Sequence, residues 1–179
     1  KVILAILVCA LVAPIGVFSG TEIPITLQTL ILLSIGMILG AWRGGIAALL
    51  YLILGFVGLP VFAEGSSGID KLWGPSGGFL ISFVLATWLV GKMAASKWGQ
   101  TWFGVFVTFV VGHDLILLIG CLWLGWMSGW KILPEVIKSL LPGLIIKIVV
   151  GTLFIGGFNA LLRLLIQRRA AKGNVQDWP

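Results

Sequence analysis

The stretch ITLQTLILLSIGMILGAWRGGIAALLYLILGFVGLPVF, residues 25–62, decides the fold class. Its only charged residue is Arg43. A single helix of this length would run about 57 Å at 1.5 Å per residue, far more than the roughly 30 Å core of a bilayer. We therefore expect two membrane-spanning helices, at residues 25–41 and 46–59, joined by a tight turn at residues 42–45.

The rest of the chain divides in the same way. Residues 60–78, PVFAEGSSGIDKLWGPSGG, have the Gly, Ser and Pro content of a loop, and residues 125–141 hold Pro134 and three charges. Residues 168–179 form a polar tail, expected to be cytoplasmic. We expect an all-α integral membrane protein whose single domain, residues 1–167, is one compact bundle of six transmembrane helices. The expected spans are residues 2–18, 25–41, 46–59, 79–94, 102–123 and 144–165.

The composition agrees with this class. Of 179 residues, 59% are hydrophobic and 10% charged, whereas soluble domains have roughly 25% charged residues. Soluble enzymes and nucleic-acid modules are thereby excluded, and the net charge of +6 reports topology instead. With six spans, the basic residues Lys1, Arg43, Lys92 and Lys97 and the basic tail share one side. The positive-inside rule then predicts that both termini are cytoplasmic and that the long loops face outward, with the lipid bilayer as surroundings.

The sequence contains no Walker A or HExxH motif, so it lacks the motifs of a P-loop ATPase and of a zinc metalloprotease. Gly91 and Lys92 lack the spacing of a Walker A motif, so ATP-driven transport would need the ATPase of a partner. One histidine and two cysteines are too few for a transition-metal cluster. We expect a binding or transport subunit and no enzyme, with no metal and no cofactor.

Three ionisable residues fall inside expected spans, where such groups are costly and mark functional sites. Lys147 either meets an anionic group at the mouth of the bundle or snorkels to the interface. Asp114 either pairs with a donor such as Lys147 or faces a wet cavity, and it would be the coupling group of a self-sufficient, ion-coupled secondary transporter. His113 is expected to be a packed, neutral side chain.

The loop after the third span offers the parts of a small-molecule site. Phe62, Trp73 and Phe79 supply apolar walls, and Glu64, Ser66 and Gly77 lie among the polar residues and exposed amides between them. An ordinary extracellular loop would have a similar composition.

The first span carries small residues at intervals of four. Ala5, Cys9 and Ala13 lie on one helix face, which lets another helix approach closely. Contact with the protein's own bundle and contact with a partner protein are both open. Cys9 and Cys121 are expected to be buried free thiols.

Several motifs resemble those of the BioY family, the biotin-specific substrate-binding subunits (S-components) of energy-coupling factor transporters. The matching segments, in the family's order, are ITLQTL at 25–30, LYLILGFVGLPVFA at 50–63, GPSGGF at 74–79, LLIGCLWL at 117–124 and LPG at 141–143 followed by Lys147.

The resemblance implies capture of biotin from outside by a six-helix S-component. It implies two kinds of partner, a transmembrane coupling protein of the EcfT or BioN type and ATPase subunits of the EcfA or BioM type, which alone use ATP. Ala5, Cys9 and Ala13 match the family's docking face for the coupling protein. An S-component for another vitamin, and a purely structural subunit, remain alternatives.

The resemblance also assigns residues in the site. Gln28 matches the family's glutamine, the loop at 62–78 matches the ligand-covering loop, and Lys147 matches the lysine that meets the biotin carboxylate. Leu144 stands where the family often has aspartate, and Glu64 where a small or amide residue is usual. The acidic partner of Lys147 is therefore lost or moved, conceivably to Asp114.

Overall fold

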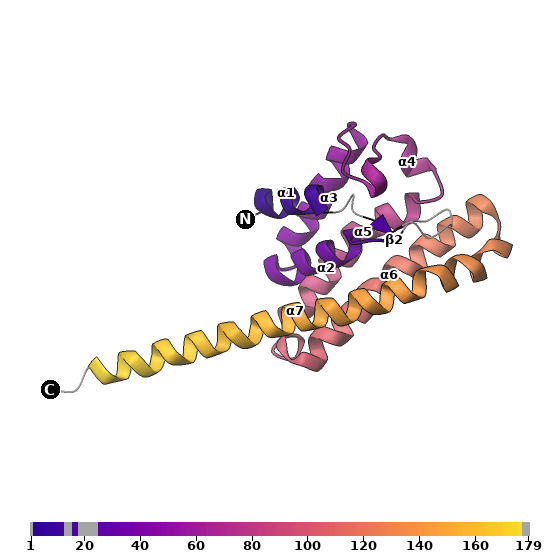
Figure 1. The fold of residues 1–179 in the computed structure, drawn as a ribbon. Coiled ribbons are helices and arrows are strands. Elements are labelled where there is room, and N and C mark those ends of the chain that lie inside the picture. Colours follow the sequence, from indigo (N-terminus) through magenta and orange to yellow (C-terminus); the bar gives the residue numbers. More distant parts are fainter. Residues whose placement is uncertain (1, 13–15, 18–24, 177–179) are drawn as a thin grey trace.

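The computed structural model describes residues 2–12, 16–17 and 25–176, which are almost entirely helical (Figure 1). The α-helices are α1 Val2–Val12, α2 Gln28–Leu39, α3 Ala41–Phe56, α4 Asp70–Trp73, α5 Gly77–Ala94, α6 Trp102–Ser128 and α7 Leu133–Gln176. Short 3-10 turns lie in the connections: η1 Ala63–Gly65, η2 Trp98–Gln100 and η3 Trp130–Ile132. The strands β1 Gly16–Val17 and β2 Ile25–Thr26 pair antiparallel.

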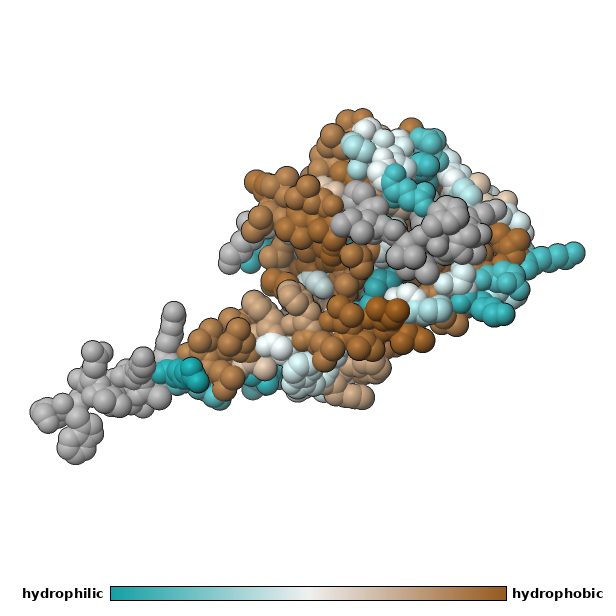
Figure 2. Space-filling view, in the orientation of Figure 1, coloured by the Kyte–Doolittle hydropathy of each residue, from teal (hydrophilic) through white to brown (hydrophobic). Residues whose placement is uncertain are grey.

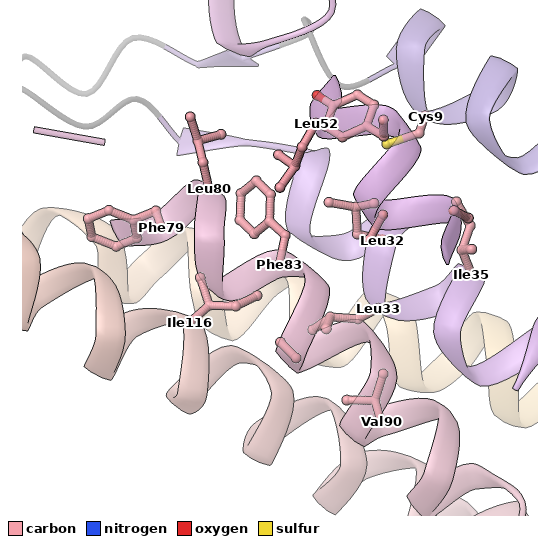
Figure 3. Packing of buried hydrophobic residues seen from close by; sticks show 14 of the residues in the cluster. Cys9, Leu32, Leu33, Ile35, Leu52, Phe79, Leu80, Phe83, Val90 and Ile116 are labelled. Atoms are coloured by element: carbon pink, nitrogen blue, oxygen red, sulfur yellow. The ribbon is translucent and has the colours of Figure 1, made fainter. Parts of the chain in front are cut away.

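Helix α5 is the centre of the bundle, in contact with α2, α3 and α6. Small residues make this possible, because a Cβ on Gly91 of α5 would lie 2.6 Å from the backbone nitrogen of Ala41. Close backbone approach of this kind is how helices associate in membranes, where lipid is as apolar as the side chains. Helix α1 lies on α3 and α2, and α7 lies on α6. Figure 3 shows the side chains that fill the space between these helices.

The turn expected at residues 42–45 is wrong. Helix α2 ends and α3 begins around Gly40, whose φ of 82° lies in the left-handed region that glycine tolerates. Gly44 and Gly45 lie inside α3 instead, both buried. A Cβ on Gly44 would lie 2.7 Å from the Cα of Gly36 on α2, so this glycine serves helix packing.

Other expected boundaries also change. The helix at the N-terminus ends at Val12, two residues before Pro14 in the sequence, and Gly16–Val17 are a strand instead of the end of a span. Residues 125–141 are mostly helical, because α6 runs to Ser128 and α7 starts at Leu133. Pro134 is the second residue of α7, where the missing N–H costs no helical hydrogen bond.

Three helical segments are long and apolar enough to cross a membrane: Gly77–Ala94, Trp102–Ser128 and Trp130–Arg168. Three more apolar helices, Val2–Val12, Gln28–Leu39 and Ala41–Phe56, are shorter. Figure 2 shows a largely hydrophobic face, with hydrophilic residues gathered around the α4 loop and the α6–α7 connection. Helix α7 extends well beyond the other helices at its C-terminal end (Figure 1).

Candidate functional site

A cavity of about 240 Å³ lies where the start of α2, the loop before α5 and the facing parts of α5, α6 and α7 meet. Its polar and charged lining residues are Thr26, Gln28, Thr29, Glu64, Ser66, Lys71, Ser76, His113 and Lys147. Its apolar lining residues are Phe62, Ala63, Phe79, Leu80, Phe83, Ile116, Leu117, Leu140 and Leu144. Figure 3 shows Phe79, Leu80 and Phe83 on α5, with Ile116 on α6 on the side of Phe83.

Lys147 brings the cavity an ammonium group that neutral atoms hold in place. Its Nζ donates to the hydroxyl of Thr29 at 3.0 Å and to the backbone carbonyl of Thr26 at 3.3 Å, and its side chain is half-buried. Neither partner carries a charge, so neither balances that of the lysine. A half-buried cation with neutral partners is suited to an anionic ligand.

His113 extends this arrangement to α6. Its Nδ1 lies 2.9 Å from the carbonyl of Phe109 and therefore donates to it, because a carbonyl can only accept. In the neutral ring Nε2 is then an acceptor, and it lies 3.4 Å from the Thr29 hydroxyl. Lys147, Thr29 and His113 thus form a chain of hydrogen bonds that joins α7, α2 and α6.

Gln28 belongs to a second network, which ties α2 to the loop. Its Nε2 donates to the hydroxyl of Tyr51 at 2.8 Å, and that hydroxyl donates to the backbone carbonyl of Val61 at 2.5 Å. Gln28 and Tyr51 are both buried. The amide of Gln28 is consequently fixed at the edge of the cavity.

The loop between α3 and α5 is attached to the bundle at further points. The ring of Phe62 is 2% exposed and lies over Gly55, where a Cβ would come within 2.1 Å of it. The amide of Gly68 donates to the carbonyl of Gly55 at 2.8 Å, and the indole of Trp123 donates to the carbonyl of Gly74 at 3.0 Å. These contacts hold the loop over the cavity.

Six of the residues predicted to bind a ligand line this one cavity: Gln28, Phe62, Glu64, Ser66, Phe79 and Lys147. Trp73 does not, because its side chain is on α4 and 66% exposed. Gly77 is also absent from the lining. A Cβ on Gly77 would lie 1.9 Å from the carbonyl oxygen of Leu72, so Gly77 lets α5 begin against α4.

The expectation that Asp114 pairs with Lys147 or faces a wet cavity is wrong. Asp114 is exposed on α6 and is not part of the cavity lining. It does not replace the acidic partner of Lys147, and Leu144 adds an apolar wall where the family often has aspartate. The apolar row on α6 that contains Leu118 and Leu122 is exposed on the same side.

The small-residue face of α1 points into the bundle. Cys9 is fully buried and belongs to the hydrophobic core, and Ala5 packs against that core; Figure 3 shows Cys9 pointing from α1 into the bundle. Of the two open interpretations, contact with the protein's own helices is therefore the one observed for Ala5 and Cys9. Ala13 lies outside the described residues.

Sequence reasoning missed Thr29 and Tyr51 as parts of the site, and His113 lines the cavity in addition to being packed. Thr29 directly follows Gln28, and polar residues at the start of an apolar helix were a signal for both. Tyr51, the single tyrosine of the chain, lies in a helix of apolar residues. Its hydroxyl needs a partner when buried. No three His, Cys, Asp or Glu side chains among the described residues could hold a metal ion.

The fold is that of a helical membrane protein, and its cavity combines apolar walls with the ammonium group of Lys147. Residues 1–164 match the BioY family, and the chain belongs to that family. It is 36% identical over 151 residues to "Biotin transporter BioY2" of Lactococcus lactis subsp. cremoris (strain MG1363), a match that covers 75% of this chain and 79% of the relative.

Two further comparisons agree. The chain is 34% identical over 137 residues to "Probable biotin transporter BioY" of Pyrococcus horikoshii, with 71% of this chain and 80% of the relative covered. A crystal structure described as the "S-component for biotin from an ECF-type ABC transporter" is similar with a TM-score of 0.73 and 26% sequence identity, over 89% of this chain and 88% of that one.

Proposed function

We propose that this chain is a membrane-embedded biotin-binding subunit of a vitamin uptake transporter. Membership of the BioY family, the names of its relatives and the similarity to a biotin S-component support this proposal. The observation that carries it is the cavity itself, in which the Lys147 ammonium lies opposite apolar walls and beside fixed amide and hydroxyl groups. The site has donors and walls for binding and needs no covalent chemistry.

The chemical parts of biotin match the parts of this cavity. Its carboxylate would accept hydrogen bonds from Lys147, with Thr29 holding the ammonium in position. Its apolar bicyclic body would lie against Phe79 and Phe83. Its ureido group, which both donates and accepts, would meet the amide of Gln28 and the hydroxyl of Ser66, while the loop with Phe62 and Glu64 covers the entrance.

Six membrane crossings and their sidedness are part of the proposal. The three long helices and the three shorter apolar helices would each cross once, with the α6–α7 connection and the loop over the cavity on the same side. Arg43, Lys92 and Lys97 lie at the other end, near the junctions α2–α3 and α5–α6. The positive-inside rule places that end, and both termini, in the cytoplasm and opens the cavity outward.

Transport itself would need partners. A transmembrane coupling protein and ATPase subunits of an energy-coupling factor module would supply the energy, since this sequence has no Walker A motif. The subunit would then reside in the cytoplasmic membrane of a prokaryote, carry no cofactor of its own and change orientation or conformation against the coupling protein to release biotin inside.

Calorimetric titration of the detergent-purified protein tests the proposal. We expect saturable binding of biotin and no binding of thiamine or riboflavin. Lys147→Ala should weaken biotin binding by about ten-fold to over a hundred-fold, because a hydrogen bond to a charged group contributes about 1.5–3 kcal/mol. Lys138→Ala removes an exposed lysine from the same helix and should leave the affinity unchanged. Binding of another vitamin in place of biotin would contradict the assignment of biotin as the ligand. Unchanged biotin binding by Lys147→Ala would contradict the proposed role of the lysine.

A further inference from the structure

A second cavity lies at the opposite end of the bundle from the biotin cavity. It has a volume of about 210 Å³ and is formed by the ends of α2 and α5, the turn η2 and the C-terminal half of α7. Its apolar wall includes Met37, Ile155 and Leu162, and its polar groups are Gln100, Asn159 and Arg163. Arg163 lines this cavity and none of the described carboxylates does, so the lining carries a positive charge.

Arg163 has most of its donors free in this cavity. One of them, Nη2, donates to the backbone carbonyl of Gln100 at 3.1 Å, which anchors the guanidinium to η2. A guanidinium has five N–H donors in a planar fork that fits two oxygens of a phosphate. Asn159 lies one turn earlier on the same face of α7 and makes no side-chain hydrogen bond within the described part of the chain.

The apolar part of the cavity continues onto the surface of α7. Leu162 is 41% exposed and Ile166 is 66% exposed, and both line the cavity. Beyond the cavity, α7 continues past the ends of α2 and α5 and away from the rest of the bundle (Figure 1). A free anion would make no favourable contact with such a wall, whereas the acyl chain of a phospholipid would pack along it.

We propose that this cavity binds an anionic phospholipid, with the phosphate held by Arg163 and Asn159 and an acyl chain along Leu162 and Ile166. The basic residues at this end, among them Lys97 and Arg168, also attract anionic headgroups at the membrane surface. Arg163 differs from them because it combines an anchored guanidinium with an apolar wall. The bound lipid closes the gap between α7 and the ends of α2 and α5.

Native mass spectrometry of the full chain released from detergent micelles tests the proposal, with phosphatidylglycerol, phosphatidylcholine and inorganic phosphate as probes. We expect one phosphatidylglycerol to bind more tightly than phosphatidylcholine. Arg163→Gln should weaken the binding of phosphatidylglycerol by about ten-fold or more, as expected for a lost charge-assisted contact. Arg168→Gln, which removes an exposed charge outside the cavity, should change it by no more than about three-fold.

A second variant blocks the cavity without changing its charge. Ala94→Leu fills space at the cavity wall and should also weaken phosphatidylglycerol binding, which decides the matter if Arg163→Gln does not fold. Equal binding of the two lipids by the wild-type protein would overturn the proposal, as would equal losses in Arg163→Gln and Arg168→Gln. Binding of inorganic phosphate with the affinity of the lipid would show a simple anion site and would also overturn it.

Discussion

Lys147 on α7 and Asp114 on α6 both interrupt apolar helices, yet they face opposite surroundings. Lys147 is half-buried, donates to Thr29 and Thr26 and lines the cavity that we propose for biotin. Asp114 is exposed on the outer side of α6, in line with Leu118 at 59% exposure. The position of a charge along a span is therefore a poor guide to its role, and the direction in which the side chain points decides it.

The largest expected effect compares an inward with an outward aromatic side chain. Phe79 is 8% exposed and lies over Gly120, so Phe79→Ala should lower the free energy of unfolding by about 3–5 kcal/mol through loss of packing. Phe103 on α6 is 66% exposed, and Phe103→Ala should have a small effect. Unfolding in urea with mixed micelles measures both, and equal losses would contradict the assignment of inner and outer faces.

Removal of the Tyr51 hydroxyl should have the next largest effect. Tyr51→Phe leaves the Gln28 amide and the Val61 carbonyl without this partner, which costs about 1–3 kcal/mol of unfolding free energy for buried groups. The loop over the cavity should also become easier to cleave by protease. Ser34→Ala, which removes a hydroxyl bonded only within α2, is the control. A Tyr51→Phe protein as stable and as resistant as this control would show that the network does not hold the loop.

A smaller effect is expected when the hydroxyl that positions the Lys147 ammonium is removed. Thr29→Val removes the hydroxyl between Lys147 and His113, so the ammonium loses one of its two partners. Biotin affinity should fall by about five-fold, equivalent to ~1 kcal/mol, in calorimetric titration. Thr152→Val removes a hydroxyl that bonds within α7 and should leave affinity unaltered. Tighter biotin binding by Thr29→Val would mean that Thr29 competes with the ligand for the lysine.

The smallest effect is expected at Asp114. Since this carboxylate does not line the cavity, Asp114→Asn should bind biotin with an affinity within about two-fold of wild type, as expected away from packing and polar networks. Uptake by proteoliposomes containing the chain alone should not respond to a proton or sodium gradient. Gradient-driven uptake that Asp114→Asn abolishes would restore the ion-coupled transporter as the function.

The sequence predicted site residues best where a polar, charged or aromatic side chain stands out from an apolar segment. The family resemblance assigned Gln28 and Lys147 to the site, and the aromatic residues flanking a Gly-rich loop suggested Phe62 and Phe79. These four residues do line one cavity. The family motifs also predicted the loop at residues 62–78 as part of the site, and Phe62, Glu64 and Ser66 of this loop line the cavity. Hydropathy located the helical segments because burial in lipid needs long apolar runs.

What the sequence could not give depends on packing between helices. Gly40 and Gly44 are four residues apart in similar sequence surroundings. Only the structure shows that Gly40 forms the turn between α2 and α3, whereas Gly44 lies inside α3 and allows contact with Gly36. Residues 125–141 hold Pro134 and three charges, which predicted a loop, yet α6 runs to Ser128 and α7 starts at Leu133. Helix α7 also continues through Pro142. Proline is tolerated in membrane helices because neighbouring groups satisfy the freed carbonyl.

The pairing of Lys147 with a carboxylate is the central claim, and a double cycle of protein and ligand tests it most directly. Calorimetry would measure the binding of biotin and of its neutral carboxamide to the wild-type protein and to Lys147→Ala. We predict that wild type prefers biotin by about ten-fold or more and that Lys147→Ala loses this preference, a coupling of ~1.5–3 kcal/mol. An equal preference for biotin in both proteins would contradict the account, because the carboxylate would then be recognised elsewhere.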